Sequence, residues 1–241
     1  MNTTIKVKNL TKDFITIKAV NDISFEAHKG DVIALLGPNG AGKSTLMNMI
    51  TSYLSPTSGE VFILDKDINQ HPIFAKENIG FLSEGAPLYP DLSVNSFLSY
   101  IAELKGFYGK KRKEEVARVS ELANITDILT QKVETLSKGY SRRVGFAQSI
   151  IGNPPILLLD EPTDGLDPNQ KEYMRQLISK MGKDKTIIIS THLLEEAETI
   201  CNRIILINKG EIMADGTLEE ILKKAKTKDL AATFKKLTKT K

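Results

Sequence analysis

The apolar positions of the chain form two kinds of strand pattern. Largely continuous apolar runs are typical of parallel strands buried on both faces, and they occupy residues 32–36, 155–159 and 186–191. Apolar and polar residues alternate in residues 4–8 and 17–25, which predicts an antiparallel layer with a possible bend at Asn21 and Asp22. Further strands are expected at residues 60–64, 78–82, 203–207 and 211–214. The pattern therefore predicts an α/β fold with a mainly parallel core sheet and an N-terminal antiparallel β layer.

A helical spacing of apolar residues replaces the strand pattern in the middle of the chain. Between about residues 88 and 123 two apolar faces follow each other, formed by Val94, Phe97, Leu98, Ile101, Leu104, Val116, Val119 and Leu122. Further helices are expected at residues 44–50, 141–150 and 169–181. Helices gathered between strands predict an inserted helical subdomain at residues 85–153, within a single domain of residues 1–241. Residues 1–84 and 154–241 then form the core.

A glycine-rich loop joins the strand at residues 32–36 to the helix at residues 44–50. It fits the pattern G-x-x-x-x-G-K-[ST] and consists of Gly37, Pro38, Asn39, Gly40, Ala41, Gly42, Lys43, Ser44 and Thr45. Glycines let backbone N–H groups turn inward around a phosphate chain, and Lys43 adds a mobile cation. The helix start directs its positive end at the phosphates, and the Ser44 hydroxyl can bind Mg²⁺. A glycine turn without a ligand is the alternative, but the flanking strand and helix favour a phosphate site.

Titratable side chains stand at the ends of two other buried strands. Asp160 and Glu161 follow the run at residues 155–159, and His192 follows the strand at residues 186–191. Ligands bind at the carboxyl ends of parallel strands, so Asp160 is expected to hold Mg²⁺ directly or through water, and Glu161 to polarise a water. Two acids after a strand can also form a simple turn, and a lone histidine there can be structural. With a phosphate loop upstream, the two acids are better explained as site residues.

The length of 241 residues and the ordinary composition suit one large globular domain. No apolar run approaches the roughly 18 residues that a membrane span needs, and the first residues lack the apolar core of a signal peptide. The chain is therefore expected in the cytosol. A single cysteine, Cys201, excludes an internal disulfide and is most simply a packing residue.

The net charge of +3 is unevenly distributed along the chain. Residues 223–241 hold eight lysines and one acid, Asp229, which gives +7 and leaves −4 for the rest of the chain. Such a tail could contact anionic lipid or nucleic acid. The helical spacing of Leu230, Phe234 and Leu237 instead favours ordinary docking of a solvated helix end.

Five motifs in order resemble the ATP-binding subunits of ABC transporters over essentially the whole chain. They lie at residues 37–45, 136–140, 157–162 and 165–167 and at His192. The resemblance implies a P-loop NTPase fold that hydrolyses ATP with Mg²⁺. It implies that Phe14 stacks on adenine, that the loop at residues 37–45 binds the phosphates and that Asp160 supports Mg²⁺. Glu161 is implied as the general base, and His192 as a contact of the γ-phosphate.

The resemblance also implies a dimer, because the opposite subunit completes each ATP site in this family. Ser137 and Gly139 resemble the signature motif that completes the site, and Asp167 is implied as the loop acid that links two sites. The chain contains one phosphate loop and one signature. A second copy, or a related ATP-binding subunit, is therefore expected as a partner.

Three positions depart from the common family motifs. The signature reads Leu-Ser-Lys-Gly-Tyr at residues 136–140 where L-S-G-G-Q is common, and Phe14 replaces the usual Tyr. Phe14 keeps a ring face, although taken alone it would be assigned to the core. Glu84 stands where the family has the Gln of the Q-loop and is expected to bind Mg²⁺ near the γ-phosphate, with a solvated loop acid as the alternative. Together with Pro87-Leu88-Tyr89-Pro90, these departures look similar to the bacterial single-domain subunits that serve exporters.

The expected function is ATP hydrolysis that powers export of an unidentified substrate through a separate membrane-spanning permease. The chain is then expected on the cytoplasmic side of the membrane, peripheral through that permease. The alternative is a soluble, non-transport ABC ATPase that acts on DNA or ribosomes. Such proteins need long heptad repeats or two nucleotide domains in one chain, and the sequence has neither, so no nucleic-acid partner is expected.

Overall fold

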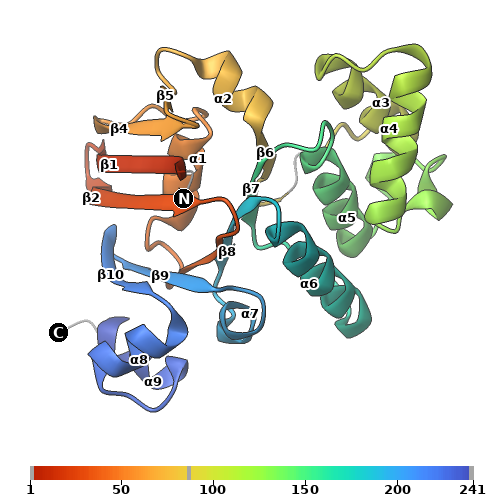
Figure 1. Ribbon diagram of the computed structural model, residues 1–241. Coiled ribbons are helices and arrows are strands. Elements are labelled where there is room, and N and C mark those ends of the chain that lie inside the picture. Colours follow the sequence, from red (N-terminus) through yellow and green to blue (C-terminus); the bar gives the residue numbers. More distant parts are fainter. Residues whose placement is uncertain (1–2, 86–87, 239–241) are drawn as a thin grey trace.

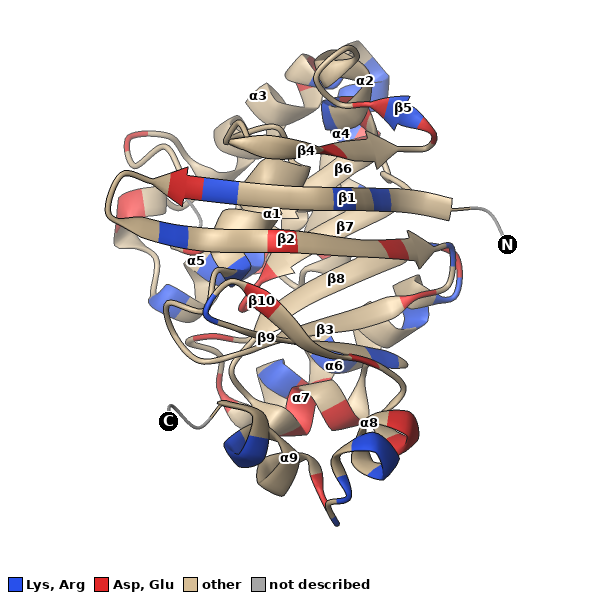
Figure 2. Ribbon diagram, turned by 90° about the vertical axis from the view of Figure 1, so that its left-hand side faces the viewer, with Lys and Arg blue, Asp and Glu red and all other residues tan. Residues whose placement is uncertain are grey.

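The structure, a computed structural model, describes residues 3–85 and 88–238. Its strands form an antiparallel sheet and a mainly parallel sheet (Figure 1). The antiparallel sheet has the order β2-β1-β4-β5 and consists of β1 (Thr3–Phe14), β2 (Ile17–His28), β4 (Ser58–Ile63) and β5 (Lys66–Asp67). Figure 2 shows this sheet in front of helix α1 (Lys43–Ile50) and the parallel strands. The predicted antiparallel layer is therefore confirmed.

Strands β1 and β2 are longer than the alternating pattern predicts. Their pairing continues as far as Phe14 and Ile17, so Phe14 ends β1 and does not lie in a loop between two short strands. The register shifts along the ribbon, and Asn9 and Asp22 adopt positive φ angles of 46° and 52°. Such bulges absorb the twist of a long two-stranded ribbon and break the alternation of buried and exposed positions. The bend expected at Asn21 and Asp22 is thus an irregularity within a continuous strand.

The second sheet has the order β10-β9-β3-β8-β7-β6. Its strands are β3 (Val32–Leu36), β6 (Ile79–Leu82), β7 (Ile156–Asp160), β8 (Thr186–Thr191), β9 (Arg203–Asn208) and β10 (Glu211–Gly216). Neighbouring strands from β9 to β6 pair in parallel, whereas β10 returns antiparallel to β9. The predicted mainly parallel core sheet is confirmed.

The two faces of the parallel sheet belong to different cores, because successive side chains of a strand point to opposite sides. Ile33 and Leu35 of β3 pack with α1 and the antiparallel sheet, whereas Ala34 and Leu36 pack with the C-terminal helices. The same alternation places Leu158 of β7 on the side of α1, and Leu157 and Leu159 of β7 on the side of the remaining helices. Those helices include α6 (Pro168–Gly182), whereas α7 (Leu194–Thr199) packs through Ala197 with Ala34 and Leu36.

Two short helices of the core were not predicted from the sequence. One is α7, and the other is α2 (Pro72–Asn78), which precedes β6, so the strand expected at residues 78–82 begins at Ile79. Ala75 is the one buried residue of α2, so its seven residues show no apolar stripe long enough to reveal a helical period. Pro72 stands at the first helical position, which is the remaining local signal.

The expected helices of the middle region are present as α3 (Val94–Leu104), α4 (Gly109–Leu122) and α5 (Lys138–Ser149). Short 3₁₀ helices at Thr126–Ile128 and Val133–Thr135 join α4 to α5. Figure 1 shows the three helices together at the end of the molecule opposite the antiparallel sheet. Their apolar residues share one cluster with Leu157, Ile187 and other strand residues. The subdomain boundaries at residues 85 and 153 stay a prediction, and residues 86 and 87 lie outside the described residues.

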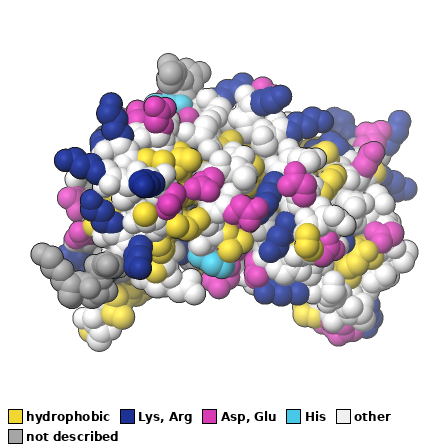
Figure 3. All heavy atoms as spheres, turned by 90° about the horizontal axis from the view of Figure 1, so that it is seen from below, with side chains coloured by type: hydrophobic (Ala, Val, Ile, Leu, Met, Phe, Trp, Pro, Cys, Tyr) yellow, Lys and Arg dark blue, Asp and Glu magenta, His cyan; other side chains and the backbone are white. Residues whose placement is uncertain are grey.

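The C-terminal helices α8 (Leu218–Ala225) and α9 (Leu230–Thr238) cover the edge near β9. Leu230 is fully buried and Phe234 packs partly against the same cluster, so the C-terminal helix docks by its apolar spacing. Figure 3 shows the side of the molecule that carries these helices. Its Lys and Arg side chains are separated from one another, with apolar surface between them. None of the helices within the described ranges has both the length and the apolarity of a membrane span.

Cys201 lies between α7 and β9 and packs partly buried against two apolar clusters. Burial raises the pKa of its thiol to about 12, and the nearby Glu196 carboxylate adds to the rise. The thiol therefore stays protonated near neutral pH, as suits a packing residue.

Candidate functional site

The carboxyl ends of three neighbouring strands meet at one edge of the parallel sheet. Strand β8 pairs with β3 on one side and with β7 on the other, so Leu36 lies beside Thr191 and Asp160 lies beside Ser190. The loops that follow these strands contain the phosphate-loop residues, Glu161 and His192. Segments that are far apart in the sequence therefore line one pocket, as expected for ligand sites of parallel sheets.

The phosphate loop needs its glycines for its own packing as well as for a ligand. A Cβ atom on Gly37 would lie 2.3 Å from the Ile207 carbonyl oxygen of β9. A Cβ on Gly42 would lie 2.2 Å from the Ala19 carbonyl oxygen of β2, and Gly42 has a φ of 103° that disfavours other residues. The loop is thus held between two neighbouring strands before any phosphate binds.

Lys43 folds back over its own loop. Its Nζ donates to the carbonyl oxygens of Gly37 at 2.7 Å and Pro38 at 3.0 Å. Burial lowers the pKa of the Lys43 amine, and the carboxylates of Glu161, Asp160 and Glu84 oppose that effect. An anionic phosphate at this position would give the buried ammonium a charge partner.

The pocket beside the loop has a volume of about 800 Å³, within the range of small-molecule sites. The predicted site residues that line it are Phe14, Asn39, Gly40, Ala41, Gly42, Lys43, Ser44, Thr45, Glu84, Asp160, Glu161 and His192. Lining residues without a predicted role are Thr16, Ile17, Lys18, Ala19, Ser190 and Lys209. Gly37 and Pro38 stand at the start of the loop, and their carbonyl oxygens bind the amine of Lys43, which lines the pocket. The side chain of Phe14 is 44% exposed, so the core assignment considered for it does not hold.

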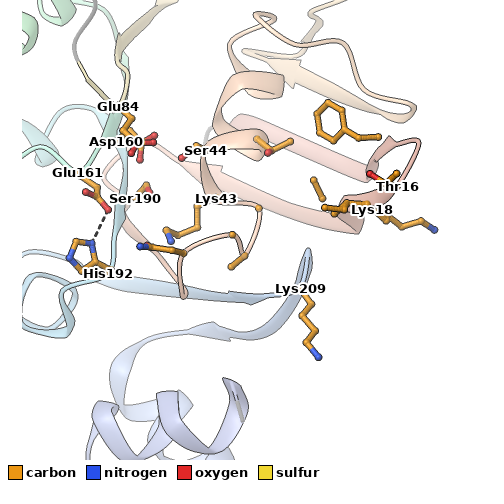
Figure 4. A pocket seen from close by; sticks show the side chains of 18 residues that line it. Thr16, Lys18, Lys43, Ser44, Glu84, Asp160, Glu161, Ser190, His192 and Lys209 are labelled. Atoms are coloured by element: carbon orange, nitrogen blue, oxygen red, sulfur yellow. Dashed lines mark hydrogen bonds and ion pairs between the residues drawn. The ribbon is translucent and has the colours of Figure 1, made fainter. Parts of the chain in front are cut away.

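The catalytic candidates Glu161 and His192 are in direct contact. The distance between Glu161 Oε1 and His192 Nδ1 is 2.8 Å (Figure 4). Glu161 has a φ of 48°, a left-handed conformation that costs a non-glycine residue about 1–3 kcal/mol. Its backbone N–H donates to the Ser190 carbonyl oxygen at 2.9 Å. The neighbouring strand thus helps to hold this strained backbone.

Three oxygen-bearing side chains lie at one end of the pocket. Figure 4 shows the carboxylates of Glu84 and Asp160 close to each other, with the Ser44 hydroxyl beside them. Asp160 is 3% exposed, and the buried hydroxyl of Ser190 nearby has no hydrogen-bond partner among the described residues. Across residues 3–85 and 88–238 no group of three or more Asp, Glu, His or Cys forms a metal cage. A hydroxyl with one or two carboxylates is nevertheless the donor set from which Mg²⁺ is bound together with phosphate and water, so these residues fit that ion.

Three predicted residues lie outside the pocket but close to one another. Ser137 caps α5 by accepting from the Tyr140 backbone N–H. Asp167 caps α6 in a capping box with Gln170. A Cβ on Gly139 would lie 3.0 Å from the Gly165 carbonyl oxygen and 3.2 Å from Gln170 Oε1. The signature and the loop at residues 165–167 therefore form a second cluster, which is separate from the lining of the nucleotide pocket.

Two buried charged residues of the site were missed in the sequence. Arg142 of α5 donates to the backbone carbonyl oxygens of Glu161 and Ser83, and Glu196 of α7 accepts from the hydroxyls of Thr163 and Thr191. Arg142 is 6% exposed and Glu196 is 1% exposed. Burial lowers the pKa of the Arg142 guanidinium, while Asp160 and other nearby acids oppose that shift. The available signal was charge on the apolar side of a helix, at Arg142-Arg143 of α5 and at Glu196 of α7.

Comparison with known proteins identifies the family. The family model described as ABC transporter matches residues 20–164, which is more than half of the chain. The chain belongs to the ABC transporter family. The predicted ATP-binding subunit with a P-loop fold and an ATPase site is thereby confirmed.

Curated ABC transporter relatives differ in length from this chain. It is 35% identical over 223 residues to the ABC transporter ATP-binding protein NatA of Bacillus subtilis, covering 90% of this chain and 89% of that protein. It is 34% identical over 220 residues to the probable multidrug ABC transporter ATP-binding protein YbhF of Escherichia coli. That match covers 91% of this chain and 38% of YbhF, so the chain spans well under half of that relative.

Solved structures of ABC proteins have the same fold. A structure described as the ATP-binding subunit of an ABC transporter superposes with a TM-score of 0.90 at 26% identity, covering 98% of this chain and 100% of that one. The ATP-binding cassette MJ0796, in a dimeric post-hydrolysis state bound to ADP and Pi, superposes with a TM-score of 0.84 at 29% identity. That match covers 89% of this chain and 98% of the cassette.

Proposed function

We propose that this chain hydrolyses ATP to power export of a substrate through a separate membrane-spanning permease, to which it binds on the cytoplasmic side of the membrane. The observation that carries the proposal is the single pocket in which the phosphate loop meets Asp160, Glu161 and His192. The likeness to a probable multidrug transporter subunit supports the direction of transport. Residues 1–84 and 154–241 act as the catalytic core, and residues 85–153 act as the helical subdomain.

The residues of the pocket divide the work of ATP binding and hydrolysis. Phe14 stacks on the adenine, since its ring lines the pocket and is accessible. The loop N–H groups, the start of α1 and Lys43 bind the phosphates. Glu161 orients an attacking water and accepts its proton, and His192 contacts the γ-phosphate while it holds the Glu161 carboxylate at 2.8 Å. Catalysis then consists mainly of positioning and charge stabilisation.

Ser44, Asp160 and Glu84 would hold Mg²⁺, directly or through water. The ion, when bound, neutralises charge on the phosphate oxygens. Asp160 is well suited because it is buried beside the phosphate loop and would gain a charge partner there. Glu84 is exposed and lies where the nucleotide pocket meets a second cavity. It would therefore reach the ion from the edge of the site, whereas Asp160 is buried.

The charge of Glu84 leads to a prediction about Mg²⁺. A Glu84→Gln chain is expected to stay folded and active but to depend less steeply on free Mg²⁺, because the carboxylate repels the phosphates when the ion is absent. Glu84→Ala is expected to uncouple hydrolysis from the permease more than it harms ATP binding. The measurement is the ATPase rate against free Mg²⁺, with and without the permease. Asp91→Asn, at an exposed acid, is the control. Superimposable curves for all chains would remove Glu84 from the site.

A second copy of the chain, or a related subunit, is proposed to complete each ATP site. Ser137, Gly139 and Asp167 lie together outside the pocket of their own chain, which leaves them available to a neighbour. The dimeric state described for the related cassette MJ0796 supports this arrangement. The contact of Gly139 with Gly165 and Gln170 would let nucleotide at one site affect the loop that reaches the other.

The permease is proposed to dock beside the helical region. A cavity of about 680 Å³ there is lined by Tyr53, Phe81, Leu88, Tyr89, Phe97 and Ile101, and it shares Ser44, Glu84 and Asp160 with the nucleotide pocket. Tyr53 is 82% exposed and Tyr89 is 53% exposed, although aromatic residues of this size are usually covered. A helix of the permease in this cavity would contact the residues that surround the γ-phosphate.

Fractionation of the native cells tests the proposed function. The tagged chain is expected to sediment with membranes, and Tyr53→Asp is expected to move most of it to the supernatant while its ATPase rate is retained, because a charge in the apolar cavity opposes docking. Met213→Asp, at an exposed apolar residue of β10, serves as the control that should stay with the membranes. A wild-type chain found in the supernatant while its permease is present would contradict the transporter function.

A further inference from the structure

Arg142 joins helix α5 to two loops of the nucleotide pocket. Its Nε and Nη2 donate to the Glu161 carbonyl oxygen at 3.0 and 2.7 Å, and its Nη1 donates to the Ser83 carbonyl oxygen at 2.9 Å. The residue is 6% exposed, so these three bonds form away from competing water. A guanidinium has donors on separate nitrogens in one rigid plane, which lets a single side chain bind both carbonyls.

The bonds to the Glu161 carbonyl hold a backbone that would not adopt its conformation freely. Glu161 has a φ of 48°, in the left-handed region that non-glycine residues avoid. Its N–H is bound by the Ser190 carbonyl oxygen, and its carbonyl oxygen is bound by Arg142. Both polar groups of the residue are therefore fixed. The direction of the carboxylate toward His192 follows from this backbone.

The third hydrogen bond of Arg142, to the Ser83 carbonyl oxygen, connects Arg142 to the segment that contains Glu84. Ser83 directly precedes Glu84, whose side chain lines the same pocket as Glu161. Arg142 lies five residues after Ser137 on the 12-residue helix α5. The start of α5 and both pocket loops are thus connected through one side chain.

We propose that Arg142 is a positioning residue that keeps Glu161 and Glu84 in their working geometry and connects that geometry to helix α5. This inference rests on the proposed role of Glu161 as the base. Arg142 acts through two backbone carbonyls and is not among the residues that line the nucleotide pocket. Its loss therefore changes turnover and leaves nucleotide affinity nearly intact, because the phosphate loop and Phe14 are untouched.

The first test compares substitutions of two buried arginines on the same helix. Arg142→Gln in the purified full-length chain is expected to lower kcat by about 10–100-fold, since small misplacements of a catalytic group have effects of this size. Its KM and its affinity for a fluorescent ATP analogue should change by less than about threefold. Arg142→Lys keeps the charge and is expected to give an intermediate kcat with a near-normal melting temperature. Arg143→Lys is the control, because Arg143 binds the Asn124 carbonyl and the Tyr140 ring outside the pocket.

A double substitution distinguishes positioning of Glu161 from a general loss of stability. In the Glu161→Gln background, Arg142→Gln is expected to lower the residual kcat by a clearly smaller factor than in the wild type, because the base is already gone and only the effect through Ser83 and Glu84 remains. An equal fold-change in both backgrounds, or a fall in affinity that matches the fall in kcat, would overturn the inference for Arg142 alone. Wild-type turnover of Glu161→Gln by itself would overturn the proposed base as well.

Discussion

Replacing Glu161 by Gln is expected to lower kcat by about 10²–10⁴-fold while ATP still binds. The amide keeps the shape of the side chain and its place beside His192, but it cannot accept the proton of the attacking water. Phosphate release under saturating Mg-ATP measures kcat, and size-exclusion chromatography should show a trapped dimer of the variant.

The control for this substitution is Glu198→Gln, which removes an exposed carboxylate from α7 without touching the pocket. Its kcat should equal that of the wild type. A Glu161→Gln chain that turns over at the wild-type rate would remove Glu161 from the role of base, whatever its contact with His192.

Mixing two inactive variants is expected to restore activity. A Lys43→Ala chain lacks the phosphate cation and a Ser137→Arg chain has a blocked signature, but the mixed dimer contains one site with an intact loop and an intact signature. Equal mixing with random pairing makes half of the dimers mixed with one working site each, which gives up to about a quarter of the wild-type rate if the sites act independently.

Two controls make the mixing experiment decisive. Each variant alone should stay inactive at the same total concentration, and differently tagged chains should co-purify to show that mixed dimers form. If mixed dimers form without any hydrolysis, the sites are not shared between subunits in the proposed way.

The sequence predicted those elements whose residues carry the signal themselves. The buried strands appear as apolar runs at residues 32–36 and 155–159, and the helices of the middle region appear as apolar faces at helical spacing. Helix α2 was missed, because seven residues with one buried side chain do not establish a period. The length of β1 was underestimated, because bulges interrupt the alternation on which a strand prediction depends.

Some residues of the site also have a local signal in the sequence, and others do not. The phosphate loop is contiguous from Gly37 to Thr45, so its pattern was complete in the sequence. Asp160, Glu161 and His192 could be placed because each follows a recognisable strand. Arg142 has no such local pattern, since its partners Ser83 and Glu161 lie 59 and 19 residues away.

The fold class, the family and the chemistry of the phosphate loop could be predicted from the amino-acid sequence, because they depend on local periodicity and on residues that are neighbours in the chain. The contacts between distant side chains became visible in the folded chain: Glu161 with His192, Arg142 with the two loop carbonyls, and Glu196 with Thr163 and Thr191. The fold also separates Ser137, Gly139 and Asp167 from the pocket of their own chain. The reason is that strand order and helix packing bring distant segments together, and no local spacing records the resulting distances.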